Sequence, residues 1–177
     1  MQRSNLADAL FKPRRIALVG ASANYAKATS RAQRYLLQHG YGGEIYPINP
    51  NRDEILGLTS YPSLSDAPQP IDHAFIMLGQ EAVFQAVRDC VTLGIPCATI
   101  LAGGFAESGQ AGRERQTKLL KIARAGGLRI LGPNSIGMIN VSDKITLSAN
   151  AMLDLPDLTT GGVSVVSQSG SLIGALL

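Results

Sequence analysis

Short apolar runs alternate with amphipathic stretches along the first 131 residues. Five runs have the length of buried strands: 15–20, 44–48, 72–78, 97–101 and 128–131. Three stretches between them repeat apolar residues with helical period: 27–39, 81–93 and 112–125. Strands alternating with helices of this length predict parallel pairing through right-handed crossovers. The predicted fold class is α/β, a Rossmann-like parallel sheet with helices on both faces, in which Pro47 would make the second strand irregular.

The chain changes character after residue 140. Residues 141–161 are polar and have no clear period, which predicts a linker. The apolar run 162–166 then predicts a new strand, followed by a turn into a helix that has only begun at Leu177. We therefore expect a domain at 1–140, a linker at 141–161 and the incomplete beginning of a second domain at 162–177.

Composition is that of a globular protein. Hydrophobic residues make up 45% and charged residues 16% of the 177 residues. No run approaches the ~20 apolar residues of a membrane span, and the N-terminus has no apolar core typical of a signal peptide. Cys90 and Cys97 fit a reducing compartment and are expected to be core residues. We expect a cytoplasmic protein without membrane contact.

The net charge of +3 is unevenly distributed. Residues 1–52 hold eight Lys or Arg and two acids, whereas residues 53–177 hold eight basic and eleven acidic residues. The positive first βαβ unit indicates either an anionic ligand or a solvated helix face. Aromatic residues amount to 5% and do not interleave with basic ones, so nucleic acid is not an expected partner.

The loops after the predicted strands are rich in glycine. In an open parallel sheet, ligands bind at the carboxyl ends of the strands, where glycine lets the backbone approach them closely. Loop 20–27 lies between a strand and a helix, so it is either a phosphate site or an ordinary tight turn. After the second strand, Arg52 stands where NAD-binding domains need an acid for the ribose hydroxyls. It indicates a ribose phosphate, as in CoA or NADP, unless it only faces solvent.

Five stretches resemble, in order, the CoA-binding domain of NDP-forming acyl-CoA synthetases and of the succinyl-CoA synthetase α-subunit. They are IALVGAS at 16–22, IYPINPNRDEILGLTSYPSL at 45–64, AGGFAESG at 102–109, LGPNSIGMIN at 131–140 and GGVSVVSQSGSL at 161–172. The last resembles the start of that family's next, flavodoxin-like domain. The likeness covers nearly the whole chain.

The resemblance implies that the chain binds coenzyme A, and it implies which residues do so. The expected CoA-binding residues are Gly20, Ala21, Ser22, Lys27, Asn49, Pro50, Arg52, Gly103, Gly104, Phe105 and Asn134. The first loop would line the nucleotide phosphates and Arg52 the ribose phosphate, while 103–105 would border the pantetheine arm and Asn134 would face the thiol. The expected phosphate-binding residues, at a helix N-terminus that receives a phosphohistidine, are Ser167, Gln168, Ser169 and Gly170.

The resemblance also implies an activity for a larger protein. The family makes acyl-CoA from a carboxylic acid, CoA and a nucleoside triphosphate, through an acyl phosphate and a phosphohistidine. The family's histidine motif is absent here, so His39 and His73 are expected to be structural, with no catalytic residue or metal ligand in the chain. ATP or ADP and Mg would be bound outside it, by an ATP-grasp domain or subunit, and this segment alone would be inactive.

Two alternatives to this function stay open. One is the CoA- or acyl-CoA-sensing, ligase-like region of a bacterial protein acetyltransferase. The other is an NADP-binding Rossmann domain, which the first loop and Arg52 permit. The sequence also leaves open the acyl acid, ADP against GDP, and whether the protein is an oligomer.

Overall fold

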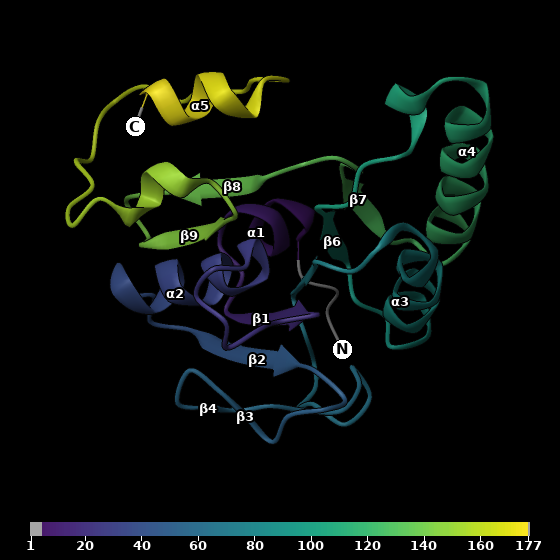
Figure 1. The fold of residues 1–177 in the computed structure, drawn as a ribbon, viewed down its shortest axis with the longest axis horizontal. Coiled ribbons are helices and arrows are strands. Elements are labelled where there is room, and N and C mark those ends of the chain that lie inside the picture. The colour runs from purple at the N-terminus through teal and green to yellow at the C-terminus, as the bar shows by residue number, and fades with distance from the viewer. Residues whose placement is uncertain (1–4, 177) are drawn as a thin grey trace.

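The computed structural model describes residues 5–176, with a five-stranded parallel sheet at its centre (Figure 1). The strand order is β2-β1-β5-β6-β7. The strands are β1 (Arg15–Val19), β2 (Glu44–Ile48), β5 (His73–Ile76), β6 (Cys97–Ile100) and β7 (Arg129–Leu131). The connecting helices are α2 (Arg31–Gln38), α3 (Gln80–Thr92) and α4 (Gln110–Ala125). Counting parallel strands alone, this is the doubly wound order 2-1-3-4-5, which confirms the predicted Rossmann-like α/β class.

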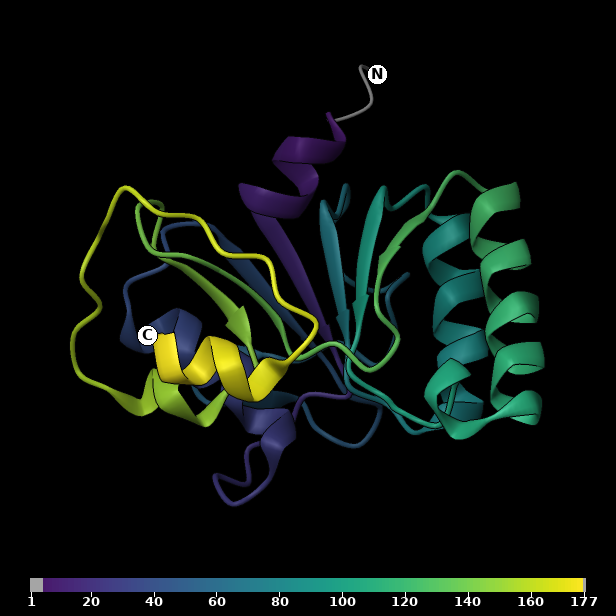
Figure 2. The same cartoon turned by 90° about the horizontal axis from the view of Figure 1, so that it is seen from above.

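Strand β1 explains why helices cover both faces of the sheet. Ile16 and Leu18 belong to the core cluster under α2, whereas Ala17 and Val19 belong to the cluster under α3 and α4. Successive side chains of a strand point to opposite faces, so an uninterrupted apolar run requires cover on both sides. Figure 2 shows α2 on one side of the sheet and the α3–α4 pair on the other.

Strand β2 is regular despite Pro47, contrary to the prediction. It pairs in register with β1 over all five of its residues and has no second strand of the main sheet on its other side. Proline cannot donate a ladder hydrogen bond, so an edge strand tolerates it. The physical reason for the difference is therefore the position of the strand in the sheet.

The remaining elements are short and lie around this sheet. They are α1 (Leu6–Phe11), η1 (Ala28–Ser30), β3 (Glu54–Ile55), β4 (Leu58–Thr59), η2 (Ala106–Ser108), β8 (Gly137–Asn140), β9 (Ile145–Ser148), η3 (Ala151–Asp154) and α5 (Gly170–Leu176). The predicted helix 27–39 begins as the single turn η1 and continues as α2.

A hairpin occupies part of the segment 141–161 that was predicted as a linker. Strand β9 pairs antiparallel with β8, and all four of its residues are buried. Ile145 and Leu147 join the core under α2. The prediction of a linker is therefore wrong for 145–148, because this short strand is stabilised by packing on distant residues. The division into domains at these boundaries stays a prediction.

Residues 162–166 form no strand, which corrects a second expectation. Val163 and Val166 are 84% and 101% exposed. A strand needs hydrogen-bonded neighbours, and none of residues 5–176 supplies them to this run. The helix expected after it is present as α5, which contacts η3.

Replacing Thr146 with valine is expected to stabilise the protein. The Thr146 hydroxyl is fully buried and has no hydrogen-bond partner within the described part of the chain. An unpaired buried polar group costs roughly 1–3 kcal/mol, so the isosteric Thr146→Val should raise the free energy of unfolding by about 1 kcal/mol. Thr99→Val is the matched control and should be destabilising, because Thr99 Oγ1 lies 2.8 Å from His73 Nε2. Urea unfolding measures the free energy of unfolding of both variants. An equal loss of stability in Thr146→Val and Thr99→Val would contradict the prediction.

Candidate functional site

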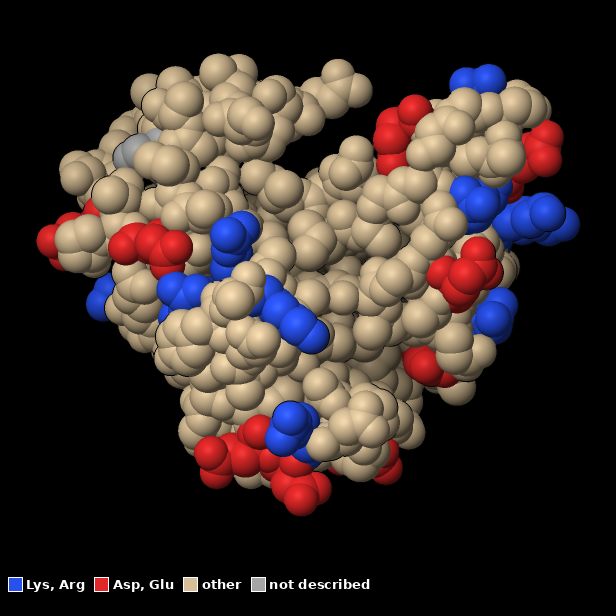
Figure 3. Space-filling model, in the orientation of Figure 1, with Lys and Arg blue, Asp and Glu red and all other residues tan. Residues whose placement is uncertain are grey.

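The loops after the parallel strands meet at one edge of the sheet, and Figures 1 and 3 look onto that edge. The strand order reverses between β1 and β5, because β2 lies on one side of β1 and the other three strands on the other. In doubly wound sheets, ligands bind in the crevice outside the carboxyl ends at such a reversal. In Figure 3 the outline of the molecule is notched between the lobe that carries α5 and the lobe of α4, above this edge.

Glycine is required at the start of the first loop. Gly20 has φ of +85°, and a Cβ there would lie 2.8 Å from Leu78 Cδ2 and 3.1 Å from the Met77 carbonyl oxygen. Both neighbours belong to the loop that follows β5. The backbones after β1 and β5 therefore approach each other closely where the strand order reverses. A side chain at position 20 would prevent this approach.

Residues 23–27 of this loop are exposed, and the loop is hydrogen-bonded mainly to itself. Ser22 Oγ accepts the N–H of Asn24 at 3.1 Å, and Asn24 Oδ1 accepts the N–H of Ala26 at 3.0 Å. Ala21 is buried, while Lys27 is exposed just before η1. The loop thus presents Ser22 and Lys27 at the same edge as Gly20.

Asn49 connects the second loop to the first. Its Nδ2 donates to the Ala21 carbonyl at 2.9 Å, and its Oδ1 accepts the N–H of Asn51 at 2.9 Å. The Asn49 side chain therefore holds the two loops together, while Pro50 and Arg52 are exposed. The ion pairs within the described chain involve Lys12, Arg15 and Arg34, so the charge of Arg52 stays available to a ligand.

Phe105 was expected to border the ligand, and the structure limits how it can do so. Its side chain is 0% exposed and packs in the core under α3 and α4, so only its backbone can border a ligand. Gly103 is exposed, and Gly104 has φ of +86°. Asn134, with φ of +57°, donates its N–H to Ala102 at 2.9 Å, and its Oδ1 lies 3.5 Å from where a Cβ on Gly103 would stand. Gly103 and Asn134 therefore do lie side by side.

Glu107 belongs to this loop and was not predicted. Its carboxylate accepts the backbone N–H groups of Gly104 and Phe105, the latter at 3.1 Å. Hydrogen bonds from its own N–H and from these two lower the pKa of Glu107. The Gly104 carbonyl accepts from Gln80 and Arg115. The available signal was a glutamate three residues after a loop glycine, at the start of a helical turn, which can reach back as in a capping box.

The SQSG loop lies next to the loop that contains Asn134. A Cβ on Gly170 would be 2.8 Å from Ile136 Cδ1, and Asn150 Nδ2 donates to the Gly170 carbonyl at 3.3 Å. Ser169 Oγ accepts the N–H of Leu172 at 3.3 Å, so Ser169 caps α5. The preceding side chains are Ser167, which bonds to Ser169 at 3.0 Å, and Gln168.

Both arginines of α2 bind oxygen atoms within the protein. Arg31 Nη1 donates to the Ala149 carbonyl at 3.2 Å, and Arg34 Nη2 lies 2.6 Å from Asp154 Oδ1. Blue and red side chains accordingly stand together on this lobe in Figure 3. For the positive charge of this first unit, the sequence indicated either an anionic ligand or a solvated helix face. Neither of these describes Arg31 and Arg34.

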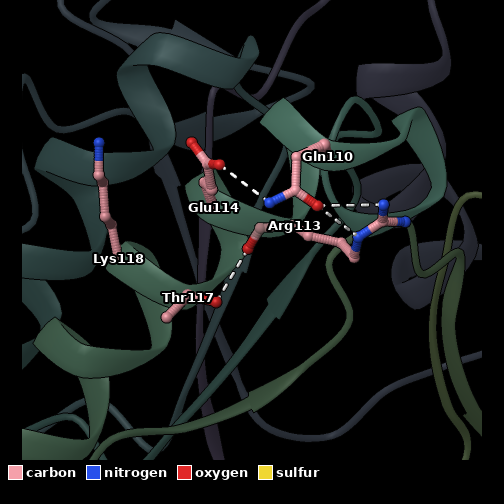
Figure 4. Close-up of a pocket in the computed structure, with 5 residues that line it drawn as sticks. All are labelled: Gln110, Arg113, Glu114, Thr117 and Lys118. Carbon is pink, nitrogen blue, oxygen red and sulfur yellow. Dashed lines mark hydrogen bonds between the residues drawn. The ribbon is translucent and has the colours of Figure 1, made fainter.

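A surface hollow of about 490 Å³ on α4 contains none of the predicted residues. Its lining side chains all come from the exposed face of α4 (Figure 4). Gln110 is bonded to Arg113 and Glu114, and the Thr117 hydroxyl donates to the Arg113 carbonyl. The hollow is the open surface of one helix, whose residues hydrogen-bond to one another, and we assign it no function.

The cysteines and histidines have structural environments. Cys90 and Cys97 are buried, which confirms them as core residues, and this burial raises the pKa of both thiols to about 12. His73 is fully buried, and His39 Nε2 lies 2.9 Å from the Leu153 carbonyl oxygen.

Among residues 5–176, no three His, Cys, Asp or Glu side chains come together as metal ligands. No helix of that described range is long and apolar enough to cross a membrane.

Comparison with known proteins identifies the relatives of this chain. An ADP-forming acetate–CoA ligase II of Archaeoglobus fulgidus is 35% identical over 168 residues, which are 95% of this chain and 24% of that protein. The α subunit of ADP-forming acetate–CoA ligase I of Pyrococcus furiosus is 34% identical over 174 residues, 96% of this chain and 37% of that protein. The chain therefore spans about a quarter to somewhat over a third of their length.

A solved structure extends this similarity to three dimensions. The dinucleotide-forming acetyl-coenzyme A synthetase 1 of Ca. Korarchaeum cryptofilum, in complex with phosphate and ADP, superimposes with a TM-score of 0.88 at 36% identity. The match covers 96% of this chain and 35% of that one. The family model described as a CoA binding domain matches residues 14–141, which hold the whole parallel sheet. This chain belongs to the family of CoA-binding domains.

Proposed function

We propose that this chain is the CoA-binding segment of an ADP-forming acid–CoA ligase. The observation that supports it most is that loops 20–22, 49–52 and 102–104 and Asn134 follow four strands of the parallel sheet, at its carboxyl edge. Within this edge, Asn49 donates a hydrogen bond to Ala21 and Asn134 donates one to Ala102. The relatives named above are acid–CoA ligases, and this chain has the fold of one of them.

The residues at this edge fit CoA chemically. The glycine backbone at position 20, the half-buried Ser22 and the exposed Lys27 suit the nucleotide phosphates. Arg52, outside every ion pair of the described chain, suits the ribose phosphate. The backbone of Gly103 and Gly104 would border the pantetheine arm, with Asn134 at the thiol end.

The proposed reaction needs more than this chain. ATP would phosphorylate a histidine, the phosphohistidine would pass its phosphoryl group to the acid to form an acyl phosphate, and the CoA thiol would take the acyl group and release inorganic phosphate. ATP or ADP with Mg, the acid and the histidine would be held elsewhere, in an ATP-grasp domain or subunit and the rest of the protein. Residues 167–170 would receive the phosphohistidine, and the packing of Gly170 on Ile136, near Asn134, supports this. The chain alone is expected to be inactive.

Loss of Arg52 is expected to remove the preference for CoA over dephospho-CoA. A charge-assisted hydrogen bond contributes roughly 1.5–3 kcal/mol, so the unchanged chain should bind CoA about ten- to a hundredfold more tightly than dephospho-CoA. Arg52→Ala should bind both with equal affinity. Titration calorimetry with both ligands measures this preference.

Arg88→Ala, on the outer face of α3, is the control and should keep the full preference. Equal binding of CoA and dephospho-CoA by the unchanged chain would remove the role of Arg52. Tight binding of NADP without CoA binding would instead favour the NADP alternative. The sensing alternative also predicts CoA binding, and acyl-CoA formation by the full-length protein distinguishes the ligase from it.

A further inference from the structure

One arginine of α2 connects the exposed first loop to the body of the protein. The guanidinium carbon of Arg34 lies 4.8 Å from the centroid of the Tyr25 ring. Tyr25 is 64% exposed, whereas the Arg34 side chain is only 19% exposed. A cation over an aromatic face is attracted by the ring quadrupole. The loop is therefore tied to the helix through Tyr25.

The rest of the loop offers few other attachments. The side-chain hydrogen bonds that the structure gives residues 22–27 stay within 22–30, among them Ser22 to Asn24 and Ser30 to Lys27. A hollow of about 320 Å³ adjoins the ring and is lined by Tyr25, Arg34, Leu37, Gln38 and Leu56. The ring is thus not packed into a core, and its contact with Arg34 matters for the position of the loop.

Arg34 is itself held by two further contacts. Its Nη2 bonds to Asp154 Oδ1 at 2.6 Å, and its guanidinium carbon lies 5.6 Å from the Tyr35 ring centroid. A planar guanidinium can bond to a carboxylate in its plane while stacking on a ring with its face. A lysine ammonium is a point charge and cannot do both.

We propose that Arg34 is a positioning residue, which holds loop 22–27 through Tyr25 in the conformation that receives the ligand phosphates. Asp154 orients Arg34 and so connects the loop to η3, which lies 120 residues away along the chain. This inference rests on the proposed function, because it assumes that the ligand binds at this loop. Arg34 acts through Tyr25 and not by contact with the ligand.

The test uses Tyr25→Ala, Tyr25→Phe, Arg34→Lys and Asp154→Asn in the full-length protein. Two quantities are measured: CoA affinity by calorimetry, and the rate of trypsin cleavage after Lys27 by mass spectrometry. Tyr25→Ala and Arg34→Lys should weaken CoA binding and accelerate cleavage about three- to tenfold, the range of a partly exposed cation–π contact. Asp154→Asn should change both in the same direction by less, and Tyr25→Phe, which keeps the ring, should match the unchanged protein.

Asp143→Asn is the matched control, since it breaks the 3.4 Å ion pair with Lys12 before β1, at the opposite edge of the sheet. It should leave CoA affinity and cleavage after Lys27 unchanged. Absence of CoA binding by the unchanged protein would overturn the proposed function. CoA binding that Tyr25→Ala and Arg34→Lys leave unchanged would overturn the positioning role alone, whatever happens to cleavage. A loss of affinity in Tyr25→Phe equal to that in Tyr25→Ala would also overturn it.

Discussion

Gly112→Ala is expected to lower the free energy of unfolding by about 3 kcal/mol or more, the range of severe overpacking. Gly112 is buried in the first turn of α4. A Cβ there would overlap the Phe105 carbonyl oxygen and lie 2.6 Å from its carbonyl carbon. These are backbone atoms, which cannot rotate away as a flexible side chain would. Either α4 or the loop that carries Gly103 and Gly104 must move.

Helix propensity alone predicts the opposite sign for this change. Alanine is favoured over glycine by about 1 kcal/mol inside a helix, so a solvent-exposed position would gain stability. Urea unfolding of Gly112→Ala decides between the two effects. Gly42→Ala is the control, because no atom lies within 4 Å of a Cβ there, and it should change stability by less than about 1 kcal/mol. A Gly112→Ala variant as stable as the unchanged chain would show that α4 does not pack on the Phe105 backbone.

The parts of the fold that the sequence predicts well are those with a strong local period. Ile16 to Val19 is apolar at every position, and only a strand buried on both faces needs that pattern. Parallel topology then places the loops after the strands at one edge without further information. Within those loops, the family resemblance then indicated Gly20, Asn49, Gly103 and Asn134 before their contacts were known.

The errors come from interactions between residues distant in the sequence. Strand β9 has only two apolar side chains, and its burial depends on α2, more than 100 residues earlier. The run 162–166 has a stronger strand pattern but no neighbour to pair with among the described residues. The apolar pattern of a segment indicates how well it would be buried as a strand. Whether the strand forms depends on neighbouring strands that can pair with it.

The candidate site shows the same limit at the level of side chains. An aromatic residue after two glycines can face a ligand or the core, and only the packing of α3 and α4 places Phe105 in the core. The ion pair of Arg34 with Asp154 spans 120 positions, so charge counts assigned that arginine to the surface or to a ligand. The contacts of Glu107 are local, and a capping-box argument could have found them.

Acid is expected to destabilise the protein through His73. His73 is fully buried, with Nδ1 3.0 Å from the Ala9 carbonyl oxygen and Nε2 2.8 Å from Thr99 Oγ1. A carbonyl only accepts, so Nδ1 carries the proton and Nε2 accepts from the Thr99 hydroxyl. Burial lowers the pKa of His73 from 6.5 to about 4, against opposing effects of the Ala9 hydrogen bond and the charge of Asp72. The neutral ring thereby fastens α1 to β5 and β6.

The sign of the pH dependence follows from this lowered pKa. Between pH 6.5 and about 4 the unfolded chain binds a proton at His73 and the folded chain does not, so stability falls as the pH falls. At 1.36 kcal/mol per pH unit, the loss over this window is roughly 3 kcal/mol, and it is absent above pH 6.5. His73→Gln should be less stable at pH 7.5, because glutamine cannot make both hydrogen bonds with the same geometry. It should lose less on acidification, because its amide does not titrate there.

Urea unfolding of both chains at intervals from pH 7.5 to 4 measures the difference between them, which removes the contribution of the carboxylates that they share. That difference should shrink continuously below pH 6.5. His39→Gln serves as the control for a histidine-to-glutamine change in a chain that keeps His73. A stability difference between the unchanged chain and His73→Gln that stays constant across the whole range would show that the pKa of His73 is the same in the folded and unfolded chains, so that the buried ring is protonated at pH 4. The hydrogen bond from Nδ1 to Ala9 and that from Thr99 to Nε2 could not then both exist, because a protonated ring has no acceptor nitrogen.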